Sequence, residues 1–351
     1  MVTIKDIARE LNVSTATVSM VLNGKAEKRV KPHIIEQVQE KARELGYKPN
    51  LMARSLKTNS TRILGFLSDH IASTPFAGRI VVGAQQAARE LGYLLVIVNS
   101  QGNKQLEAEE IEALKHYGVD GYLYACMYNQ RVQIPKNLTH EQTVIIDGTD
   151  EDGRVSSICP DEEKIGYMAT RELIDAGCTR IVFFDALPDL IAQELRYKGY
   201  EHAMYEAGLE PIDEGYTDED AFSYGAAHVL DDIQPDGIVC FNDIRAGFIY
   251  AEAERRGIYI GQDISVVSVD NQPLIINSLR PGLTSIELPH YEMGYWAVYK
   301  LVEQISQSSI IMQKMTPFTS GVQLTQLTPS ATAVECAMIR RQSVVTINQK
   351  Q

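Results

Sequence analysis

Residues 3–23 constrain this chain more than any other segment, because they combine two short helical patterns with a tight turn between them. Apolar residues recur at helical spacing from Ile4 to Leu11 and give the first pattern one apolar face. Ser14, a typical N-cap residue, opens the second pattern. A helical hairpin at a domain edge would share this pattern. Two short helices of which the second begins with small polar side chains predict, however, a helix-turn-helix whose second helix enters the DNA major groove.

A third helical pattern follows and completes a small apolar core. It begins at Pro32, which suits the first turn of a helix, and stops before Gly46. With the run after Gly46, the segment resembles the LacI/GalR family of bacterial repressors. The positions that carry the resemblance are Thr3, Asp6-Ile7-Ala8, Val13-Ser14, Thr17-Val18-Ser19, Leu22-Asn23, Gly46-Tyr47, Pro49-Asn50 and Ala53-Arg54-Ser55-Leu56.

The charge distribution supports a separate nucleic-acid-binding head. Residues 1–62 carry 12 Lys and Arg against 6 Asp and Glu, a balance of +6, whereas the rest of the chain has a balance of −19. A basic head on an acidic body fits a protein that approaches phosphates through its head alone. For the prediction of nucleic-acid binding, the charge of residues 1–62 is therefore more informative than the net charge of −13 for the whole chain.

Several classes of protein are disfavoured by what the sequence lacks. It has no export signal pattern and no apolar run long enough to span a membrane, so we expect a cytoplasmic protein. Its 5 cysteines are scattered without paired spacing, and its 7 histidines show no metal-ligand spacing, so neither a metal site nor a cofactor is expected. No catalytic constellation stands out, and we do not expect an enzyme. A free-standing solute-binding protein would have no use for residues 1–60.

From Arg62 onward, short apolar runs alternate with amphipathic helical stretches. This alternation predicts parallel sheets covered on both faces, in two doubly wound lobes. The predicted strands are 63–67, 94–98, 121–125, 144–147, 180–184, 237–241, 264–269 and 283–286. The predicted helices are 78–91, 105–117, 162–176, 192–207, 222–233, 244–256 and 291–306. The expected fold class is thus a small all-α helix-turn-helix head on an α/β body.

The family resemblance implies a body of periplasmic-binding-protein type, whose chain crosses three times between the lobes. We place these crossings near residues 159–162, 287–291 and 320–325. The expected domains are a DNA-binding head (1–48), a hinge helix or linker (49–61), a two-lobed effector-binding and dimerisation body (62–338) and a final strand end and tail (339–351). Within the body, lobe 1 takes about 62–160 and 290–322, and lobe 2 takes about 161–288 and 323–338.

The resemblance also assigns roles in the head. Thr15 and Ala16 stand where the recognition helix of this family meets base edges, by a hydroxyl or a methyl group. Met20 departs from the family pattern, in which arginine is frequent, so the usual guanine preference is not carried over. Thr17, Ser19, Asn23 and Arg29 are expected to hold phosphates. The full set of expected DNA contacts is Thr3, Ser14, Thr15, Ala16, Thr17, Ser19, Asn23, Arg29, Tyr47, Asn50, Ala53, Leu56 and Lys57.

The segment from Asn50 to Asn59 is the expected hinge. About ten residues are too few for a stable isolated helix, since roughly 12–15 are needed in water. We expect it to become helical only when two copies pair in the minor groove. Leu56 matches the family position that wedges between central base pairs and kinks the duplex, and Ala53 would let the two hinges approach closely.

Open parallel sheets bind ligands beyond the carboxyl ends of their strands, where this sequence places polar residues. By the resemblance, Asp147, Arg196, Asn242 and Asp270 match effector-binding positions, with Phe76 and Phe222 as stacking rings; further candidates are Asp69, His70 and Ser100. Carboxylates, amides, one arginine and aromatic rings suit a polyhydroxylated ligand. For any single residue, loop solvation or helix capping is the alternative.

The sequence therefore predicts a homodimeric repressor that binds pseudo-palindromic operator DNA and is released by a small sugar. The tail after residue 343 is too short and polar for a tetramer-forming heptad repeat. Regulation by a co-repressor, an architectural or activating role with the same head, and a sugar sensor that acts through a protein partner remain open alternatives.

Overall fold

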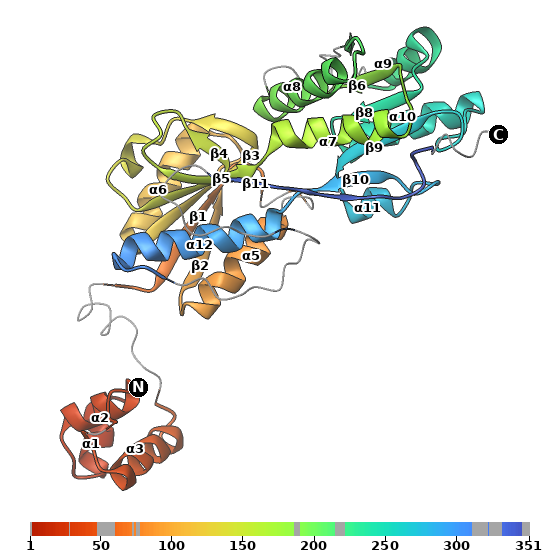
Figure 1. Cartoon of the computed structure of the whole chain (residues 1–351). Helices are drawn as coiled ribbons and strands as arrows, with labels where there is room; N and C mark the ends of the chain where they lie inside the picture. The colour runs from red at the N-terminus through yellow and green to blue at the C-terminus, as the bar shows by residue number, and fades with distance from the viewer. Residues whose placement is uncertain are drawn as a thin grey trace. The chain divides into compact units, whose positions relative to one another are not determined.

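The computed structural model of the chain consists of two compact units, Met1–Thr61 and Arg62–Gln351 (Figure 1). They correspond to the expected head and body and are described separately. The structure describes residues 2–27, 29–47, 60–71, 74, 78–185, 190–214, 222–310, 322 and 332–345.

The head is a bundle of three helices around a small apolar core. Its helices are α1 (Ile4–Glu10), α2 (Thr15–Leu22) and α3 (Pro32–Glu44). Asn12, in the left-handed region at φ 52°, makes the tight turn between α1 and α2. Fully or nearly fully buried aliphatic side chains from the three helices and from the loop after α2 meet in the centre: Ile7, Ala8, Val18, Val21, Ala26, Val38 and Ala42. The helix-turn-helix prediction is confirmed.

The body contains two sheets, each of six strands in its described part. The first sheet has the order β11-β5-β4-β3-β1-β2 and is parallel throughout. Its strands are β1 (Ile63–Ser68), β2 (Leu94–Asn99), β3 (Gly121–Val132), β4 (Thr143–Asp150), β5 (Ser156–Pro160) and β11 (Thr332–Val334).

The second sheet has the order β12-β10-β9-β8-β6-β7. Its strands are β6 (Ile181–Phe184), β7 (Ile212–Glu214), β8 (Gly237–Cys240), β9 (Ser265–Asp270), β10 (Thr284–Glu287) and β12 (Ala337–Ile339). All of its pairs are parallel except β10 with β12. We call the first sheet with its helices lobe 1, and the second sheet with its helices lobe 2.

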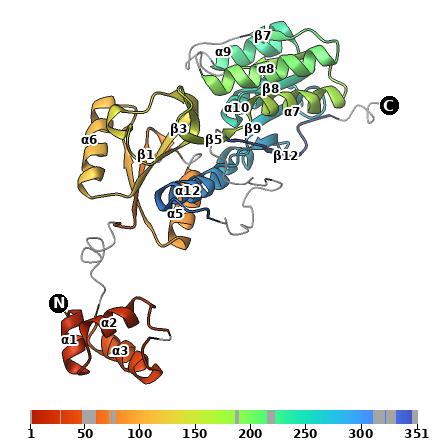
Figure 2. The same cartoon turned by 60° about the vertical axis from the view of Figure 1, so that its left-hand side comes forward.

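Helices cover both faces of each sheet, as expected of doubly wound lobes. In lobe 1, α5 (Gly78–Glu90) and α12 (His290–Ser306) cover one face, and α6 (Lys104–His116) covers the other, together with the short η2 (Lys136–Leu138) (Figure 2). In lobe 2, α7 (Glu162–Asp175) and α8 (Ile191–Glu206) cover one face. The opposite face carries α9 (Phe222–His228), η4 (Val229–Ile233), α10 (Asp243–Arg256) and α11 (Pro273–Ile276).

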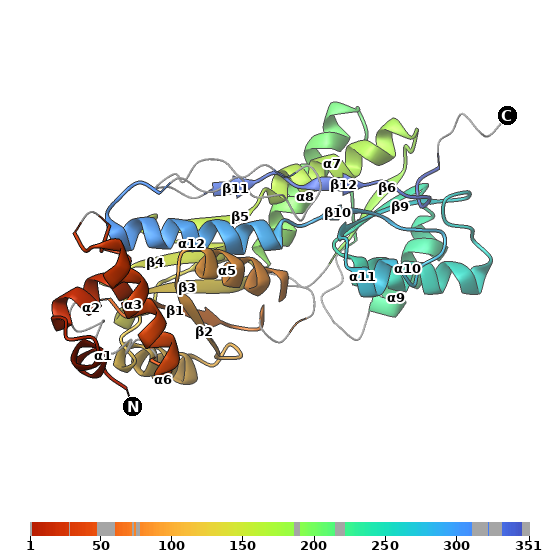
Figure 3. The same ribbon diagram turned by 90° about the horizontal axis from the view of Figure 1, so that it is seen from below.

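The chain passes between the lobes three times. Two passages, between β5 and α7 and between β10 and α12, lie where they were expected. The third was predicted near 320–325, with residues 323–338 in lobe 2. This is wrong for β11, which pairs with β5 in lobe 1, and correct for Ala337 and Met338 of β12, so the chain crosses between Val334 and Ala337 (Figure 3).

Glycines allow one pair of helices in each lobe to pack backbone against backbone. A Cβ atom on Gly83 of α5 would lie 1.9 Å from the carbonyl oxygen of Tyr291, and one on Gly294 of α12 would lie 2.0 Å from that of Ile80. In lobe 2, a Cβ on Gly166 of α7 would meet the carbonyl oxygen of residue 196 at 1.8 Å. Only glycine fits at these crossings, which therefore fix how far apart the two helices lie.

Candidate functional site

The head presents the N-terminal end of α2 as an exposed surface of small side chains. The Ser14 hydroxyl accepts a hydrogen bond from the backbone N–H of Thr17 at 3.0 Å, which caps the helix. Thr15 and Ala16 follow it and are exposed. Because the cap engages Ser14 and Thr17 locally, Thr15 and Ala16 are the side chains at this end with the greatest freedom to meet another molecule.

At the opposite end of α2, the side chain of the C-cap residue hydrogen-bonds to the last turn of the helix. The Asn23 amide donates to the carbonyl oxygen of Ser19 at 2.7 Å and to its hydroxyl at 3.3 Å. Met20, where an arginine is frequent in the family pattern, is half-buried. Ser19 and Asn23, both predicted to hold phosphates, therefore also stabilise the last turn of the recognition helix.

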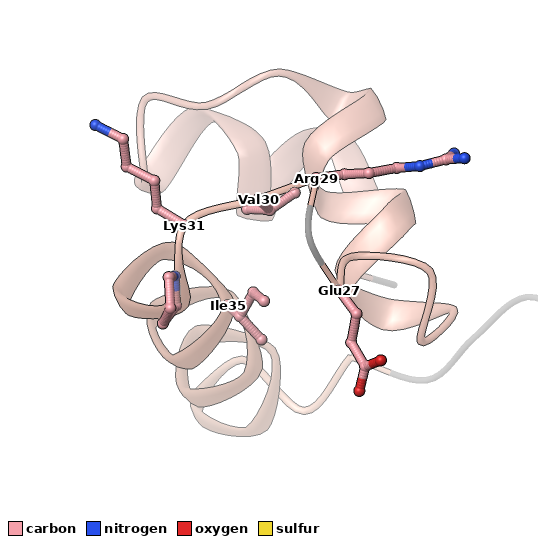
Figure 4. Close-up of a pocket in the computed structure, with 6 residues that line it drawn as sticks. Glu27, Arg29, Val30, Lys31 and Ile35 are labelled. Atoms are coloured by element: carbon pink, nitrogen blue, oxygen red, sulfur yellow. The ribbon is translucent and has the colours of Figure 1, made fainter.

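Three other predicted contacts of the head lie at its edges. Thr3 donates to the Asp6 carboxylate through its backbone N–H (2.9 Å) and its hydroxyl (2.7 Å), which caps α1. Tyr47 is half-buried against the head's core. Arg29 lies at a hollow before α3, into which Val30 and Ile35 point while Arg29 extends outwards (Figure 4). The full lining of this hollow is Glu27, Arg29, Val30, Lys31, Pro32 and Ile35.

Several predicted contacts lie outside the described residues. They are the hinge positions Asn50, Ala53, Leu56 and Lys57 and the ring of Phe76. Phe222 begins α9, but its side chain also lies outside the described part.

In the body, a cavity lies where the strand ends of both lobes meet. Its volume in this arrangement of the side chains is only about 10 Å³, far below the roughly 300–1,000 Å³ of small-molecule pockets, so the surrounding residues would have to move apart to admit a ligand of that size. The residues around it are Tyr128, Asp147, Glu162, Arg196, Phe241, Asn242, Asp270, Leu288 and His290. Tyr128 and Asp147 come from lobe 1, whereas Arg196, Phe241, Asn242 and Asp270 come from lobe 2. The four polar residues predicted most directly, Asp147, Arg196, Asn242 and Asp270, are thus brought together.

Arg196 is the central cation of the cavity and is held from three sides. Its Nε donates to the Glu162 carboxylate at 2.6 Å, and its Nη1 donates to the carbonyl oxygen of Phe241 at 2.6 Å. Its guanidinium also lies 4.5 Å from the centre of the Phe241 ring. The Arg196 and Glu162 side chains are only 4% and 2% exposed, so each charge depends on the other.

Asp147 lies within β4, at its register shift against β3, and Asp270 is the last residue of β9; both have strained backbone conformations. Their φ angles are 55° and 112°, and neighbouring Tyr128 (65°) is also left-handed. Strain of this kind collects at ligand sites, where the surrounding fold enforces it. Burial, and then the charge of Glu162, raises the pKa of Asp147 to about 8, against the opposing charge of Arg196. Burial, and then Asp243, holds the pKa of Asp270 well above its usual value.

Asn242 and Asp243, at the start of α10, have different hydrogen-bond partners. The Asn242 side chain caps the helix by accepting from the backbone N–H of Arg245 at 3.1 Å. Asp243 accepts from the Gln272 backbone N–H at 2.6 Å and from the Ser285 hydroxyl at 2.7 Å. Asn242 is therefore the cap, and Asp243 connects α10 to the loop after β9 and to β10.

The three further candidates do not line the cavity. Asp69 accepts hydrogen bonds from the Met127 backbone N–H (3.0 Å) and the Gln130 amide (3.1 Å). Ser100 donates to the Ser68 carbonyl oxygen at 3.2 Å, and His70 is exposed. Asp69, after β1, thus bonds to the backbone of β3, and Ser100, after β2, bonds to the backbone of β1.

Glu162, Phe241 and Tyr128 were not singled out from the sequence. Glu162 resembles an ordinary acidic residue in a first helical turn. Phe241 was counted as the last core residue of its strand. Tyr128 was missed because β3 was expected to end at Ala125. In the structure, a register shift between Ala125 and Gln130 lets the strand continue. Only the position of Phe241 directly before Asn242 could have indicated its role.

No cluster of three or more His, Cys, Asp or Glu side chains suited to a metal ion occurs among the described residues. In the same part of the chain, no helix has the length and apolar character that a membrane span requires.

Comparison with known families matches both units. Residues 3–50 match the model of the lacI family of bacterial regulatory proteins, and residues 170–322 match that of the periplasmic binding protein-like domain. The chain is 32% identical over 323 residues to the ribose operon repressor of Escherichia coli K12, which covers 90% of this chain and 96% of that protein. It is also 32% identical over 314 residues to the transcriptional repressor PurR of Aliivibrio fischeri, covering 87% and 92%.

Solved structures give the same result. A transcriptional regulator CelR in complex with cellobiose superposes with a TM-score of 0.65 at 25% identity, covering 98% of this chain and 100% of that one. A lac repressor dimer bound to operator and the anti-inducer ONPF superposes with a TM-score of 0.77 over 98% of this chain and 99% of that one. At 20% identity, the second match shows the fold alone.

Proposed function

Because this chain belongs to the lacI family of bacterial regulatory proteins and is a DNA-binding repressor with a small-molecule effector, we propose that its effector is a sugar. The sugar occupies the cavity between the lobes and releases the repressor from its operator. The observation that carries this proposal is the convergence of Asp147 from β4, Arg196 from α8, and Asn242 and Asp270 from the ends of β8 and β9 on one cavity. The names of the ribose operon repressor and of the CelR–cellobiose complex support a sugar over other small molecules.

The chemistry of the cavity suits a sugar. Carboxylates and amides pair with neighbouring hydroxyl groups, and the Arg196 guanidinium donates in a fixed fork. The Phe241 ring lies beside that guanidinium and provides an apolar wall for the C–H groups of a sugar. An effector in the cavity would touch residues of both lobes at once, and its binding energy would therefore depend on how the lobes sit.

DNA binding is assigned to the head, whose expected contacts stay as predicted from the sequence. Thr15 and Ala16, exposed at the start of α2, are the proposed base contacts. Thr17, Ser19, Asn23 and the other polar or basic positions are proposed to hold phosphates. Leu56, in the proposed hinge, wedges between base pairs when two copies pair.

The proposed working form is a cytoplasmic homodimer on a pseudo-palindromic operator. Two heads related by a two-fold axis read two half-sites. The effector acts only if it binds one arrangement of the lobes better than the other. A contact such as that between Arg79 of α5 and Glu287 of β10, at 2.8 Å, joins the lobes and would be strained or relieved by such a change.

Selection of genomic fragments by the purified full-length protein at physiological salt tests this proposal. Recovery of a recurrent palindrome is the expected result, and the selected fragment then serves as the probe for sugars that release it. Non-specific attraction to phosphates would instead fade steeply as salt rises. Failure to enrich any sequence, with or without sugars present, would contradict the proposed operator binding.

A further inference from the structure

The four residues after β12 are bound to two strands that lead towards the cavity. Because β12 runs antiparallel to β10, the chain continues past the start of β10. There the Ser343 hydroxyl donates to the Val266 carbonyl oxygen of β9 at 2.6 Å and accepts from the Thr284 backbone N–H of β10 at 2.8 Å. We call residues 340–343 the closing segment, which is thus held near the start of both strands.

Arg341 connects the closing segment to the loop that follows β9. Its Nη1 donates to the carbonyl oxygen of Leu283 at 2.7 Å, and its Nη2 donates to the side-chain oxygen of Asn271 at 2.7 Å. Its backbone N–H donates to the Thr284 hydroxyl at 2.9 Å. Hydrogen bonds from a charged donor are stronger than neutral ones. One guanidinium therefore joins the residue just before β10 to the first residue after β9.

The loop after β9 has a strained backbone that its contacts must maintain. The φ angle is 112° at Asp270 and 49° at Asn271. Asn271 is buried, and its backbone N–H donates to the Ser285 hydroxyl at 2.9 Å, while the next N–H, of Gln272, donates to the Asp243 carboxylate at 2.6 Å. Strained conformations of this kind persist only where the surrounding structure enforces them. The bond from Arg341 adds a charge-assisted contact to these two.

The strained loop carries one of the carboxylates of the candidate cavity. Asp270 lines the cavity, whereas Arg341 is not among the described residues around it. Any effect of Arg341 on a ligand must therefore act through the loop. Asn271 provides the connection, because its side chain bonds to Arg341 and its backbone directly follows Asp270.

We propose that Arg341 is a positioning residue of the effector cavity, and that it holds Asp270 in its cavity-facing conformation through the side chain of Asn271. This inference rests on the proposed effector site and adds a residue that lies outside it. An arginine is required, because two nitrogens of one planar group bond to two acceptors. Lysine carries its charge on a single nitrogen and cannot reproduce this fork.

Three variants and one control separate positioning from general stabilisation. Arg341→Met removes the guanidinium, and Arg341→Lys keeps the charge but loses the fork. Asn271→Gly removes the acceptor, and glycine tolerates the left-handed backbone at this position. The control is Arg340→Met in the same segment. Arg340 is 68% exposed and bonds to Glu172 of α7 at 2.8 Å, a surface ion pair of the kind that contributes little to stability.

The measurements use the full-length protein. Hydrogen exchange followed by mass spectrometry reports the opening of residues 268–276, and calorimetric titration with D-ribose, D-xylose, D-glucose and cellobiose reports the affinity for a sugar. Arg341→Met should accelerate amide exchange in residues 268–276 and weaken sugar binding, each by about tenfold or more, because one charge-assisted hydrogen bond is lost. Arg341→Lys should lie between Arg341→Met and wild type, and Arg340→Met should match wild type in both measurements.

A double variant tests whether Arg341 acts through Asn271. In the background of Asn271→Gly, the further change Arg341→Met should alter sugar affinity by no more than about twofold, because the connection is already absent. A role of Arg341 that depended on Leu283 alone would instead make the two losses of affinity add, and would overturn the inference.

The remaining outcomes distinguish this inference from the function on which it rests. Unchanged exchange of residues 268–276 in Arg341→Met, or a loss of affinity in Arg340→Met equal to that in Arg341→Met, would overturn the inference and leave the sugar effector standing. If none of the four sugars bound to the wild type, the proposed sugar effector would be refuted. The exchange measurement, which needs no ligand, would then still decide whether Arg341 holds the loop.

Discussion

Replacing Gly166 by alanine should destabilise lobe 2 and loosen the effector cavity together. A Cβ atom at this position would lie 1.8 Å from the carbonyl oxygen of Arg196 on α8, where separations below 3.0 Å essentially never occur. The two helices would have to separate by more than about 1 Å, because the obstacle is backbone and cannot rotate away. Glu162 begins the same helix one turn earlier, so the separation would also disturb its bond to Arg196.

The expected loss of stability in Gly166→Ala can be compared with the effect of the same substitution at a glycine where a Cβ atom meets no neighbour. Overpacking lowers the unfolding free energy by about 1–3 kcal/mol. Because the contact in Gly166→Ala is with rigid backbone, we expect a loss of about 3 kcal/mol. Gly247 of α10 has no atom within 4 Å of its would-be Cβ, so Gly247→Ala should gain about 0.5–1 kcal/mol from helix propensity alone.

Urea unfolding followed by far-ultraviolet circular dichroism measures the unfolding free energy of both variants. Calorimetric titration with a sugar that binds the wild-type protein measures their affinity for it. Gly166→Ala should unfold at lower urea and bind the sugar more weakly, whereas Gly247→Ala should unfold at higher urea and bind it normally. If the two variants were equally stable, or if Gly166→Ala kept the full affinity for the sugar, the reasoning from the helix crossing would be refuted.

Three further predictions concern other parts of the chain. Ser14→Ala removes the cap of α2 and should cost the head about 1 kcal/mol, seen as a lower melting temperature of the head and weaker DNA binding; an unchanged melting temperature would refute the cap's role. Tyr295→Phe deletes the 2.6 Å bond to Glu90 between α12 and α5 and should lower the unfolding free energy by about 1–3 kcal/mol; a neutral effect would show that the remaining groups satisfy Glu90. Burial raises the pKa of Asp147 from 3.8 to about 8, so the native state binds this proton more tightly and stability is lost as pH rises towards 8. Asp147→Asn should therefore gain stability relative to wild type between pH 5 and 8, measured by urea titration, and a constant difference across that range would contradict the assignment.

Much of the fold could be predicted because buried parallel strands read as continuous apolar runs. The eight predicted strands are all present, and β3 and β4 extend beyond their apolar runs. β5 was missed because Ser156–Pro160 contains two serines and a proline, although it is buried throughout. The third crossing was misplaced for a related reason. β11 is three residues long, and its pairing with β5 is a contact between distant segments that no local pattern reveals.

The expectation that ligands bind beyond strand ends selected residues that line the candidate cavity and also residues that do not. It identified Asp147 in lobe 1 and Asn242 and Asp270 in lobe 2, because a strand was expected to end just before or at each of them and parallel strands of one sheet end at the same edge. It also selected Asp69 and Ser100, whose side chains bond to nearby backbone and to Gln130 instead. The rule cannot tell a ligand-binding side chain from one that stabilises its own loop, since both are polar residues in the same kind of position.

The partner of Arg196 could not be predicted from the sequence. Glu162 lies 34 residues away on another helix, and the two meet because Gly166 and Gly199 let α7 and α8 approach closely. A small residue in a helix has several explanations when only the sequence is known. In the structure, the close crossing of α7 and α8 explains why glycine is needed at these positions and how Arg196 and Glu162 come into contact.

The most direct test of the account is whether occupancy of the cavity controls DNA affinity. The affinity of the full-length protein for its selected operator fragment would be measured by fluorescence anisotropy with and without a sugar that the protein binds. The double variant Arg196→Met/Glu162→Gln removes both buried charges together and leaves neither unpaired, and Arg255→Met, exposed on α10, is its control. The account predicts that the sugar weakens operator binding by the wild type and the control, while the double variant binds the operator normally and ignores the sugar. A double variant that the sugar still released, or a sugar bound in the cavity without effect on operator affinity, would contradict it.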